Sequence, residues 1–219
     1  MKVLDLFSGA GGCTRGYQLA GFEVTGVDIK KQRHYCGENF IQCDALTYLD
    51  WIIKTGEIYQ YGLIHASPPC QGYSRTKGLT TKQHPMLIEP TRNLLIASGA
   101  HYVIENVVGA PLVNPIMLDG TMFGLWTVRK RLFECSFPIT NIPPSIKQKS
   151  FNMGRKPEGG FKDGDYINVV GHFTDIAYAR RAMQISWMSV RELAQAIPPA
   201  YTEFIAKEYL KYVGKSDLP

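Results

Sequence analysis

Short apolar runs alternate with helical patterns along the first two thirds of the chain. The apolar runs are typical of buried strands and cover residues 2–7, 22–29, 39–43, 61–66 and 101–107. The helical patterns between them cover residues 13–20, 45–54 and 86–98. This alternation predicts an α/β fold, in which helices cover both faces of a mostly parallel, doubly wound sheet through right-handed crossovers.

The pattern changes after Gly109. Residues 116–135 predict shorter strands with a tight turn at Asp119-Gly120, and residues 136–171 are irregular and rich in Pro, Gly, Lys and Asn. Residues 189–212 return to a helical pattern that Pro198 and Pro199 interrupt. We find no internal repeat, so the sequence predicts one α/β core followed by a small irregular segment.

Composition narrows the class of protein. The 219 residues suffice for one sizeable core, and 45% hydrophobic with 20% charged residues is ordinary for a soluble globular protein. The short apolar runs and the absence of a cleavable signal pattern predict a cytoplasmic protein without a membrane partner. Five cysteines without a CxxC pair indicate free thiols, and we expect neither disulfides nor a metal site.

The net charge of +5 favours a polyanionic partner. Three basic clusters lie in loop-like sequence, namely Arg75, Lys77 and Lys82; Arg129, Lys130 and Arg131; and Lys147, Lys149, Arg155, Lys156 and Lys162. Such clusters can neutralise phosphates, and the alternative is plain solvated surface.

Cys70 follows an apolar run and two prolines, in Ser67-Pro68-Pro69-Cys70-Gln71. A strand of an α/β sheet delivers its last residues to the edge where ligands bind, and tandem prolines stiffen the turn. This setting predicts a thiol that is presented to a ligand. The alternative is a cysteine that packs in the core as a small hydrophobic residue.

A glycine-rich turn joins the first strand to the first helix, in Phe7-Ser8-Gly9-Ala10-Gly11-Gly12. Glycine lets the backbone approach a ligand, and a helix N-terminus offers free amides, so the turn fits a nucleotide-like cofactor. Its spacing is neither the dinucleotide fingerprint nor a Walker loop. Asp28 and Asp44 follow the next two strands, where each could accept hydrogen bonds from a ribose or merely cap a helix.

Glu105 lies inside the apolar run 101–107, where an acid is costly unless it is paired or functional. It is the strongest acid/base candidate, and a salt-bridged structural Glu is the alternative. Arg129 and Arg131 alternate along a strand-like segment, so we expect them to share one face. Two guanidinium groups there could lower the pKa of the Cys70 thiol or hold a polar ring, unless they are an ordinary surface pair.

In this order, the motifs resemble those of the C5-cytosine DNA methyltransferase family. The resemblance covers residues 2–135 through the glycine turn, Asp28, Asp44, Pro68-Pro69-Cys70-Gln71, Glu105-Asn106-Val107 and Arg129-Lys130-Arg131. A second patch, residues 188–205 with Glu192-Leu193-Ala194-Gln195-Ala196-Ile197-Pro198-Pro199, resembles the closing motifs of small phage-type members. The resemblance implies a Rossmann-like methyltransferase fold and S-adenosylmethionine as cofactor.

The resemblance also implies a role for individual residues. Cys70 is then the nucleophile, and Glu105 engages the cytosine with help from Arg131 and Arg129. Phe7 lies on the adenine of the cofactor, Asp28 takes its ribose and Asp44 its adenine amine. The remaining cofactor-binding positions are Gly9, Gly11, Gly12, Ile29, Ala45, Pro68, Gln195 and Ala196.

Cytosine chemistry requires these residue types. C5 of cytosine is a poor nucleophile, and a thiolate added to C6 turns it into an enamine-like carbon that can attack a sulfonium methyl group. A carboxyl group with a raised pKa can protonate or hydrogen-bond N3 as charge moves onto the ring. The base must be single-stranded or flipped out of the duplex, and the loop at residues 71–84 could close over it.

The sequence departs from the family pattern at three points. Thr127 stands where the family has Gln, Gln195 stands where it has Asn, and only residues 136–187 are available for target recognition. We expect a catalytic and cofactor-binding core at residues 1–135, a reduced recognition segment at 136–187, and helices at 188–219 that pack back on the core. Aromatic residues of the segment could enter a DNA groove or simply pack it, namely Phe151, Phe161, Tyr166, His172 and Phe173.

We therefore expect a monomeric DNA cytosine C5-methyltransferase, of a restriction-modification or orphan phage type. Two alternatives remain open. The first is an RNA cytosine C5-methyltransferase of the tRNA-modifying branch, which shares this motif type. The second is a catalytically silent nucleic-acid binder, against which Cys70, Glu105 and both arginines argue.

Overall fold

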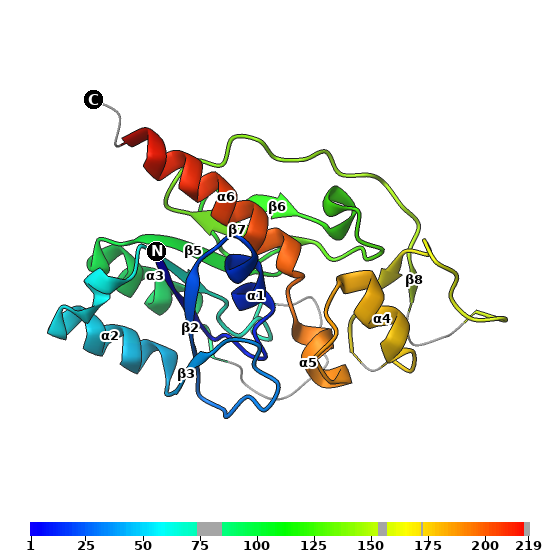
Figure 1. Ribbon diagram of the computed structural model, residues 1–219, viewed down its shortest axis with the longest axis horizontal. Helices are drawn as coiled ribbons and strands as arrows, with labels where there is room; N and C mark the ends of the chain where they lie inside the picture. Colours follow the sequence, from blue (N-terminus) through cyan, green and yellow to red (C-terminus); the bar gives the residue numbers. More distant parts are fainter. Residues whose placement is uncertain (74–84, 153–156, 172, 217–219) are drawn as a thin grey trace.

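A seven-stranded sheet forms the centre of the molecule, in the order β3-β2-β1-β4-β5-β7-β6 (Figure 1). The computed structural model describes residues 1–73, 85–152, 157–171 and 173–216. The five parallel strands are β1 (Lys2–Leu6), β2 (Glu23–Asp28), β3 (Asn39–Gln42), β4 (Leu63–Ala66) and β5 (His101–Asn106). They confirm the predicted mostly parallel α/β fold.

The reversed strand of the sheet lies near one edge. β7 (Arg131–Cys135) runs antiparallel between β5 and β6 (Ile116–Leu118). The predicted turn at Asp119 is the start of a single 3-10 turn, η3 (Gly120–Phe123). Because β1 to β5 are parallel, their carboxyl ends meet at one edge of the sheet, and the residues that follow them are brought together there.

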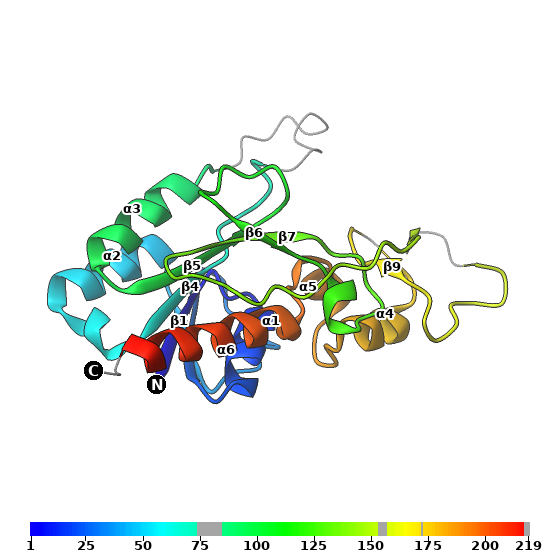
Figure 2. The same cartoon turned by 90° about the horizontal axis from the view of Figure 1, so that it is seen from above.

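Helices cover both faces of the sheet (Figure 2). α1 (Gly12–Leu19) and α6 (Pro199–Ser216) lie on one face, where Tyr17, Leu63 and Ile205 belong to one buried cluster. α2 (Ala45–Thr55) and α3 (Ile88–Ser98) lie on the other face with the 3-10 turn η1 (Glu57–Gln60). The predicted two-sided arrangement is therefore present.

The two helices on the first face pack unusually closely. A Cβ atom at Gly16 of α1 would lie 2.1 Å from the carbonyl oxygen of Pro199 and from the hydroxyl of Thr202. The Thr202 hydroxyl also donates a hydrogen bond to the carbonyl of Cys13 at 2.9 Å. Glycine is therefore required at residue 16, because any side chain would separate the start of α6 from α1.

A smaller cluster lies beyond the carboxyl edge of the sheet. It contains β9 (Ile167–Asn168), α4 (Ile176–Met183) and α5 (Val190–Gln195), and β9 also pairs with β8 (Phe151–Asn152). The break between α5 and α6 falls at residues 196–198, as the prolines predict, and Pro199 opens α6, where its missing amide costs nothing. The sequence pattern did not indicate α4.

The helical segments of the described chain include none with the length and apolar character needed to cross a membrane.

Candidate active site

Cys70 lies just past the end of β4, on a turn that is fixed from two sides. The Ser67 amide bonds to the carbonyl of Leu6 at 3.1 Å, and the Asn106 side chain donates to the carbonyl of Pro68 at 2.9 Å. Pro68 is buried, whereas Cys70 is only partly buried. The thiol is therefore presented at the carboxyl edge of the sheet, as the two prolines predict.

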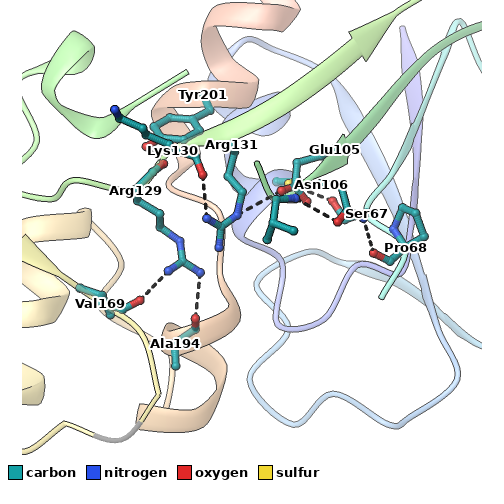
Figure 3. A network of polar contacts seen from close by, with 12 residues as sticks. Ser67, Pro68, Glu105, Asn106, Arg129, Lys130, Arg131, Val169, Ala194 and Tyr201 are labelled. Atoms are coloured by element: carbon teal, nitrogen blue, oxygen red, sulfur yellow. Dashed lines mark hydrogen bonds and ion pairs between the residues drawn. The ribbon is translucent and has the colours of Figure 1, made fainter. Parts of the chain in front are cut away.

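Glu105 points from β5 toward the same edge and pairs with Arg131, the first residue of β7. Glu105 Oε1 lies 3.3 Å from Arg131 Nε, and the Ser67 hydroxyl hydrogen-bonds the same carboxylate (Figure 3). Glu105 is 5% exposed, and burial raises its pKa although Arg131, Ser67 and Arg129 oppose the shift. The predicted raised pKa is confirmed, and a carboxyl group that keeps its proton to higher pH can act as a hydrogen-bond donor or an acid.

The pKa of the Cys70 thiol is raised by its surroundings. Burial and the nearby Glu105 carboxylate raise the pKa of the Cys70 thiol, and Arg131 and Arg129 lower it by less. The two arginines therefore act in the predicted direction, but burial and Glu105 outweigh them and the pKa of the thiol is raised. Because Glu105 opposes the thiolate, protonation of Glu105 would favour it.

Arg129 and Arg131 extend to the same side of the backbone (Figure 3), as their alternation predicts, but they contact different partners. β7 begins at Arg131, and the chain before it is held by Val128, whose amide bonds to the carbonyl of Ile167 at 2.9 Å. The Arg129 side chain is 2% exposed and donates to the carbonyls of Val169 and, at 2.8 Å, Ala194 (Figure 3). Arg129 thus joins β9 to the end of α5 rather than pairing with Glu105.

The glycine turn opens at the same edge, between β1 and α1. Phe7 and Gly9 both adopt positive φ, of 60° and 52°, and no atom lies within 4 Å of the position that a Gly9 Cβ would take. The Ser8 hydroxyl is buried without a hydrogen-bond partner among the described residues. The turn therefore offers open backbone and an unused polar group to a ligand.

Gly11 and Gly12 serve packing as well as the turn. The Cβ position of Gly11 lies 2.7 Å from the Cys36 sulfur, and that of Gly12 lies 2.4 Å from the carbonyl oxygen of Ile197. Of the three predicted glycines, only Gly9 faces open space. Gly11 and Gly12 can offer a ligand their backbone but no free face.

Asp28 ends β2 and holds the glycine turn. Its carboxylate accepts hydrogen bonds from the amide of Gly9 at 3.0 Å and from that of Lys30 at 2.9 Å. A carboxylate has about four acceptor positions, so two remain for a diol. The adjacent Ile29 is 63% exposed, as a residue that covers a flat ligand would be in its absence.

Asp44 caps α2, which is the alternative that the sequence left open. Its Oδ1 accepts from both the amide and the hydroxyl of Thr47, at 2.9 and 3.0 Å. Among the described residues Oδ2 has no partner, so one oxygen of this exposed side chain is available to an amine. Ala45 behind it is buried.

Gln195 and Ala196 close α5 on the opposite side of the turn. Gln195 is exposed and Ala196 is buried, next to the Ala194 carbonyl that receives Arg129. Trp187, earlier in this segment, donates from its indole nitrogen to the carbonyl of Ala10 at 2.9 Å. The closing patch therefore contacts the glycine turn directly, although the two are far apart in sequence.

Several predicted positions fall outside the described residues. They are most of the loop at 71–84 with Arg75, Lys77 and Lys82, and in the second half Arg155, Lys156 and His172. Of the predicted aromatic residues, Phe161 stacks on Tyr178 at 5.0 Å between ring centroids and Phe173 is 1% exposed, so both pack the segment. Phe151 is 42% exposed and remains accessible.

A buried chain of polar side chains lies behind Glu105 and was not predicted from the sequence. His65 of β4 is fully buried, and its ring lies 2.9 Å from the Tyr17 hydroxyl and 3.0 Å from the Ser67 hydroxyl. The signal that would have found it is the one that identified Glu105, a polar residue inside an apolar strand run.

Known proteins resemble both the sequence and the fold of the chain. Residues 1–115 match the profile of the family described as C-5 cytosine-specific DNA methylase. The type II methyltransferase M.HgiGI of Herpetosiphon aurantiacus is 31% identical over 51% of this chain and 94% of its own length. M.HgiDI of the same organism, another type II methyltransferase, is 26% identical over 61% of this chain, which spans about half (51%) of its length.

A solved structure extends the likeness to nearly the whole chain. A candidate DNA modification methyltransferase encoded within a prophage of E. coli superposes with a TM-score of 0.69, at 16% identity, over 98% of this chain and 99% of its own. At that identity the match supports the fold, including the segment after residue 135, and the sequence profile supports the family.

Proposed function

The chain belongs to the C-5 cytosine-specific DNA methylase family, and on that basis we propose that it transfers a methyl group to C5 of cytosine in DNA. The observation that carries the proposal is the Glu105–Arg131 ion pair beside the Cys70 turn, at the edge where the glycine turn also opens. A nucleophile, an acid and an anion-stabilising cation are the three groups that addition to a cytosine ring requires.

In this proposal Cys70 is the nucleophile and Glu105 the acid. The Cys70 thiolate forms a bond to C6 while the Glu105 carboxyl group gives its proton to N3, and the electron pair of the C5–C6 double bond becomes available at C5. After methylation, C5 loses its proton to water, the Cys70–C6 bond breaks, and N3 returns its proton to Glu105. Arg131 holds Glu105 in place and stabilises charge on the ring.

Protonation of Glu105 also helps to form the nucleophile. The Glu105 carboxylate raises the pKa of Cys70, so neutralisation of Glu105 by a proton lowers the cost of the thiolate. The active form of the pair therefore holds one proton. This proton is on Glu105, and Cys70 is a thiolate.

We further propose S-adenosylmethionine as the cofactor, which supplies an electrophilic methyl group on a sulfonium. The open side of Gly9, the unused hydroxyl of Ser8 and the spare oxygens of Asp28 and Asp44 fit a ligand with a ribose and an adenine amine. In this assignment Asp28 takes the ribose, Asp44 the amine, and Phe7 and Ile29 the adenine. Gly11, Gly12, Ala45, Pro68, Gln195 and Ala196 complete the walls.

Residues 136–187 are the proposed recognition segment, between the core at 1–135 and the helices at 188–219. A target cytosine must leave the duplex to reach Cys70, because the ring face is covered inside a base stack. Lys147, Lys149 and Lys162 of this segment are described, and charges of this kind bind phosphates without reading sequence. We propose a monomer that binds duplex DNA with short or loose sequence specificity.

Methyl transfer from labelled S-adenosylmethionine to duplex DNA and to tRNA, in parallel, tests the proposal. We expect label in DNA as 5-methylcytosine, and a covalent complex with an oligonucleotide that contains 5-fluorocytosine, which cannot release the enzyme. Label in tRNA alone would replace the proposal by the RNA alternative. Folded protein that labels neither and forms no complex would favour the silent binder.

A further inference from the structure

A continuous buried hydrogen-bond chain leads from α1 to Glu105. The Tyr17 hydroxyl lies 2.9 Å from His65 Nδ1, and His65 Nε2 lies 3.0 Å from the Ser67 hydroxyl. Ser67 in turn hydrogen-bonds the Glu105 carboxylate. Tyr17 and His65 are fully buried, so water does not compete for the hydrogen bond between them, and Ser67 is partly buried.

Hydrogen-bond counting fixes the direction of the chain. In the part of the protein that the structure describes, His65 Nδ1 is the hydrogen-bond partner of the Tyr17 hydroxyl, so this hydroxyl is satisfied as a donor when Nδ1 carries no proton. Burial lowers the pKa of His65 to about 3, so the ring is neutral and its one proton is on Nε2. Nε2 then donates to the Ser67 oxygen, which leaves the Ser67 proton for Glu105.

With the other tautomer of His65, the Ser67 hydroxyl could not donate a hydrogen bond to the Glu105 carboxylate. If Nδ1 carried the proton, Nε2 would take the Ser67 proton, and Ser67 would offer Glu105 only an acceptor. The Cys13 sulfur, 3.9 Å from the Ser67 oxygen, is at most a weak partner and does not change this choice. The tautomer of a buried histidine thus decides whether Glu105 receives a donor.

We propose that Tyr17, His65 and Ser67 are positioning residues that orient Glu105 and set its affinity for the proton that it gives to cytosine. This inference rests on the proposed function for its purpose, and on the hydrogen-bond chain alone for its geometry. Nothing in the motifs that define the family resemblance includes Tyr17 or His65.

Other charged and titratable groups face Glu105 from every element around it. They are Arg131 of β7, Arg129 before β7, Cys70 after β4, Cys13 of α1, Asp5 of β1 and Tyr201 of α6. None of these groups is removed when Tyr17 or Ser67 is substituted, so a change in the titration of Glu105 reports the lost hydrogen-bond donor.

Carbon-13 NMR of the Glu105 carboxyl carbon in the full chain, assigned through Glu105→Gln, measures the effect without activity. In Ser67→Ala the carboxylate loses a donor, so we expect its titration midpoint to rise by roughly one pH unit. In Tyr17→Phe the tautomer of His65 is no longer fixed, and we expect a smaller rise. Nitrogen-15 NMR should show the Nε2–H tautomer of His65 in the unmodified protein.

Tyr209→Phe is the matched control. The Tyr209 residue is also buried, and its hydroxyl donates to the carbonyl of Gly62, which is not part of the hydrogen-bond chain to Glu105. An unchanged midpoint in Ser67→Ala, an equal rise in Tyr209→Phe, or an Nδ1–H tautomer of His65 would overturn the proposal. In methyl transfer, the acid limb of kcat/KM should move with the NMR midpoint. If the NMR shifts occur and no methyl transfer is found, the proposed function fails and the positioning chain stands.

Discussion

Asp5 of β1 and His65 of β4 are register partners in the parallel sheet, and both side chains are fully buried. Burial raises the pKa of Asp5 to about 7 and lowers that of His65 to about 3. Between these values both side chains are neutral. The face of the sheet behind the candidate active site therefore holds polar groups that are mostly uncharged at mildly acid pH.

Asp5→Asn should make the protein less sensitive to rising pH. The pKa of Asp5 is raised from 3.8 to about 7, so its contribution to stability is complete at low pH and is lost as pH rises through the folded pKa. Asn keeps an acceptor for the Thr14 hydroxyl and cannot ionise. Between pH 3.8 and about 7 the unmodified protein should lose up to about 4 kcal/mol of unfolding free energy that the variant keeps. Urea denaturation at several pH values measures this difference.

Thr14→Val is the companion variant. It removes the 2.6 Å hydrogen bond that Thr14 donates to Asp5, so the pKa of Asp5 should rise further, and the loss of stability should be larger and extend to higher pH. Parallel stability curves for all three proteins would show that Asp5 does not titrate in this window.

Cys70→Ala should abolish methyl transfer while cofactor binding survives. The proposed bond to C6 needs the sulfur, whereas the glycine turn and Asp28 do not depend on it. Calorimetry with S-adenosylmethionine and labelling of DNA separate the two effects. Cys135→Ala, on β7, should retain methyl transfer, and turnover by Cys70→Ala would exclude the covalent mechanism.

Glu105→Gln should increase the acidity of the Cys70 thiol while it lowers methyl transfer. The Glu105 carboxylate raises the pKa of Cys70, and its removal leaves Arg131 and Arg129 unopposed near the sulfur. Alkylation of Cys70 by iodoacetamide, followed by mass spectrometry of its peptide across pH, should therefore show a lower midpoint. A higher or unchanged midpoint would mean that Glu105 and Cys70 are not coupled.

The two arginines should separate stability from activity. Arg129→Lys cannot donate to the carbonyls of Val169 and Ala194 together, and we expect it to lower the free energy of unfolding by about 2 kcal/mol. Arg131→Lys keeps a cation beside Glu105 and should fold normally but transfer methyl groups more slowly. The measurements are urea denaturation and initial rates. The reverse result, a normal stability for Arg129→Lys and an unfolded Arg131→Lys, would contradict these roles.

Gly16→Ala should detach α6 from α1, whereas Gly214→Ala should not. A Cβ at Gly16 meets the Pro199 carbonyl at 2.1 Å, but one at Gly214, near the end of α6, meets nothing within 4 Å. The first change should destabilise the protein by about 1–3 kcal/mol and the second should stabilise it by roughly 0.5–1 kcal/mol. Thermal unfolding distinguishes them, and equal effects would contradict the close packing.

Much of the fold was predictable because its strands are short and buried on both faces. Parallel strands of this kind appear as apolar runs, and Glu105 was conspicuous because it interrupts one. α4 was missed although its buried residues, from Tyr178 to Met183, follow helical spacing, because it has only eight residues and comes after an irregular segment. His65 was not singled out, although it interrupts an apolar run just as Glu105 does.

The geometry of Arg129 could not be predicted from local sequence. Strand spacing predicted the common side of Arg129 and Arg131 but not the partners of Arg129, because pairing of Thr127 with Ile167 fixes the backbone before β7 begins. The carbonyls that receive Arg129 lie 40 and 65 residues away along the chain. Contacts of such long range are set by tertiary structure, and no pattern within a few residues contains them.

The contact between Arg129 and the Ala194 carbonyl has a consequence for biosynthesis. During translation Cys70, Glu105 and Arg131 leave the ribosome well before Ala194, so a growing chain carries its nucleophile without the segment that supports Arg129. A chain that ends before Ala194 lacks one of the carbonyls that receive Arg129, so the surroundings of the candidate active site are complete only after α5 has been synthesised.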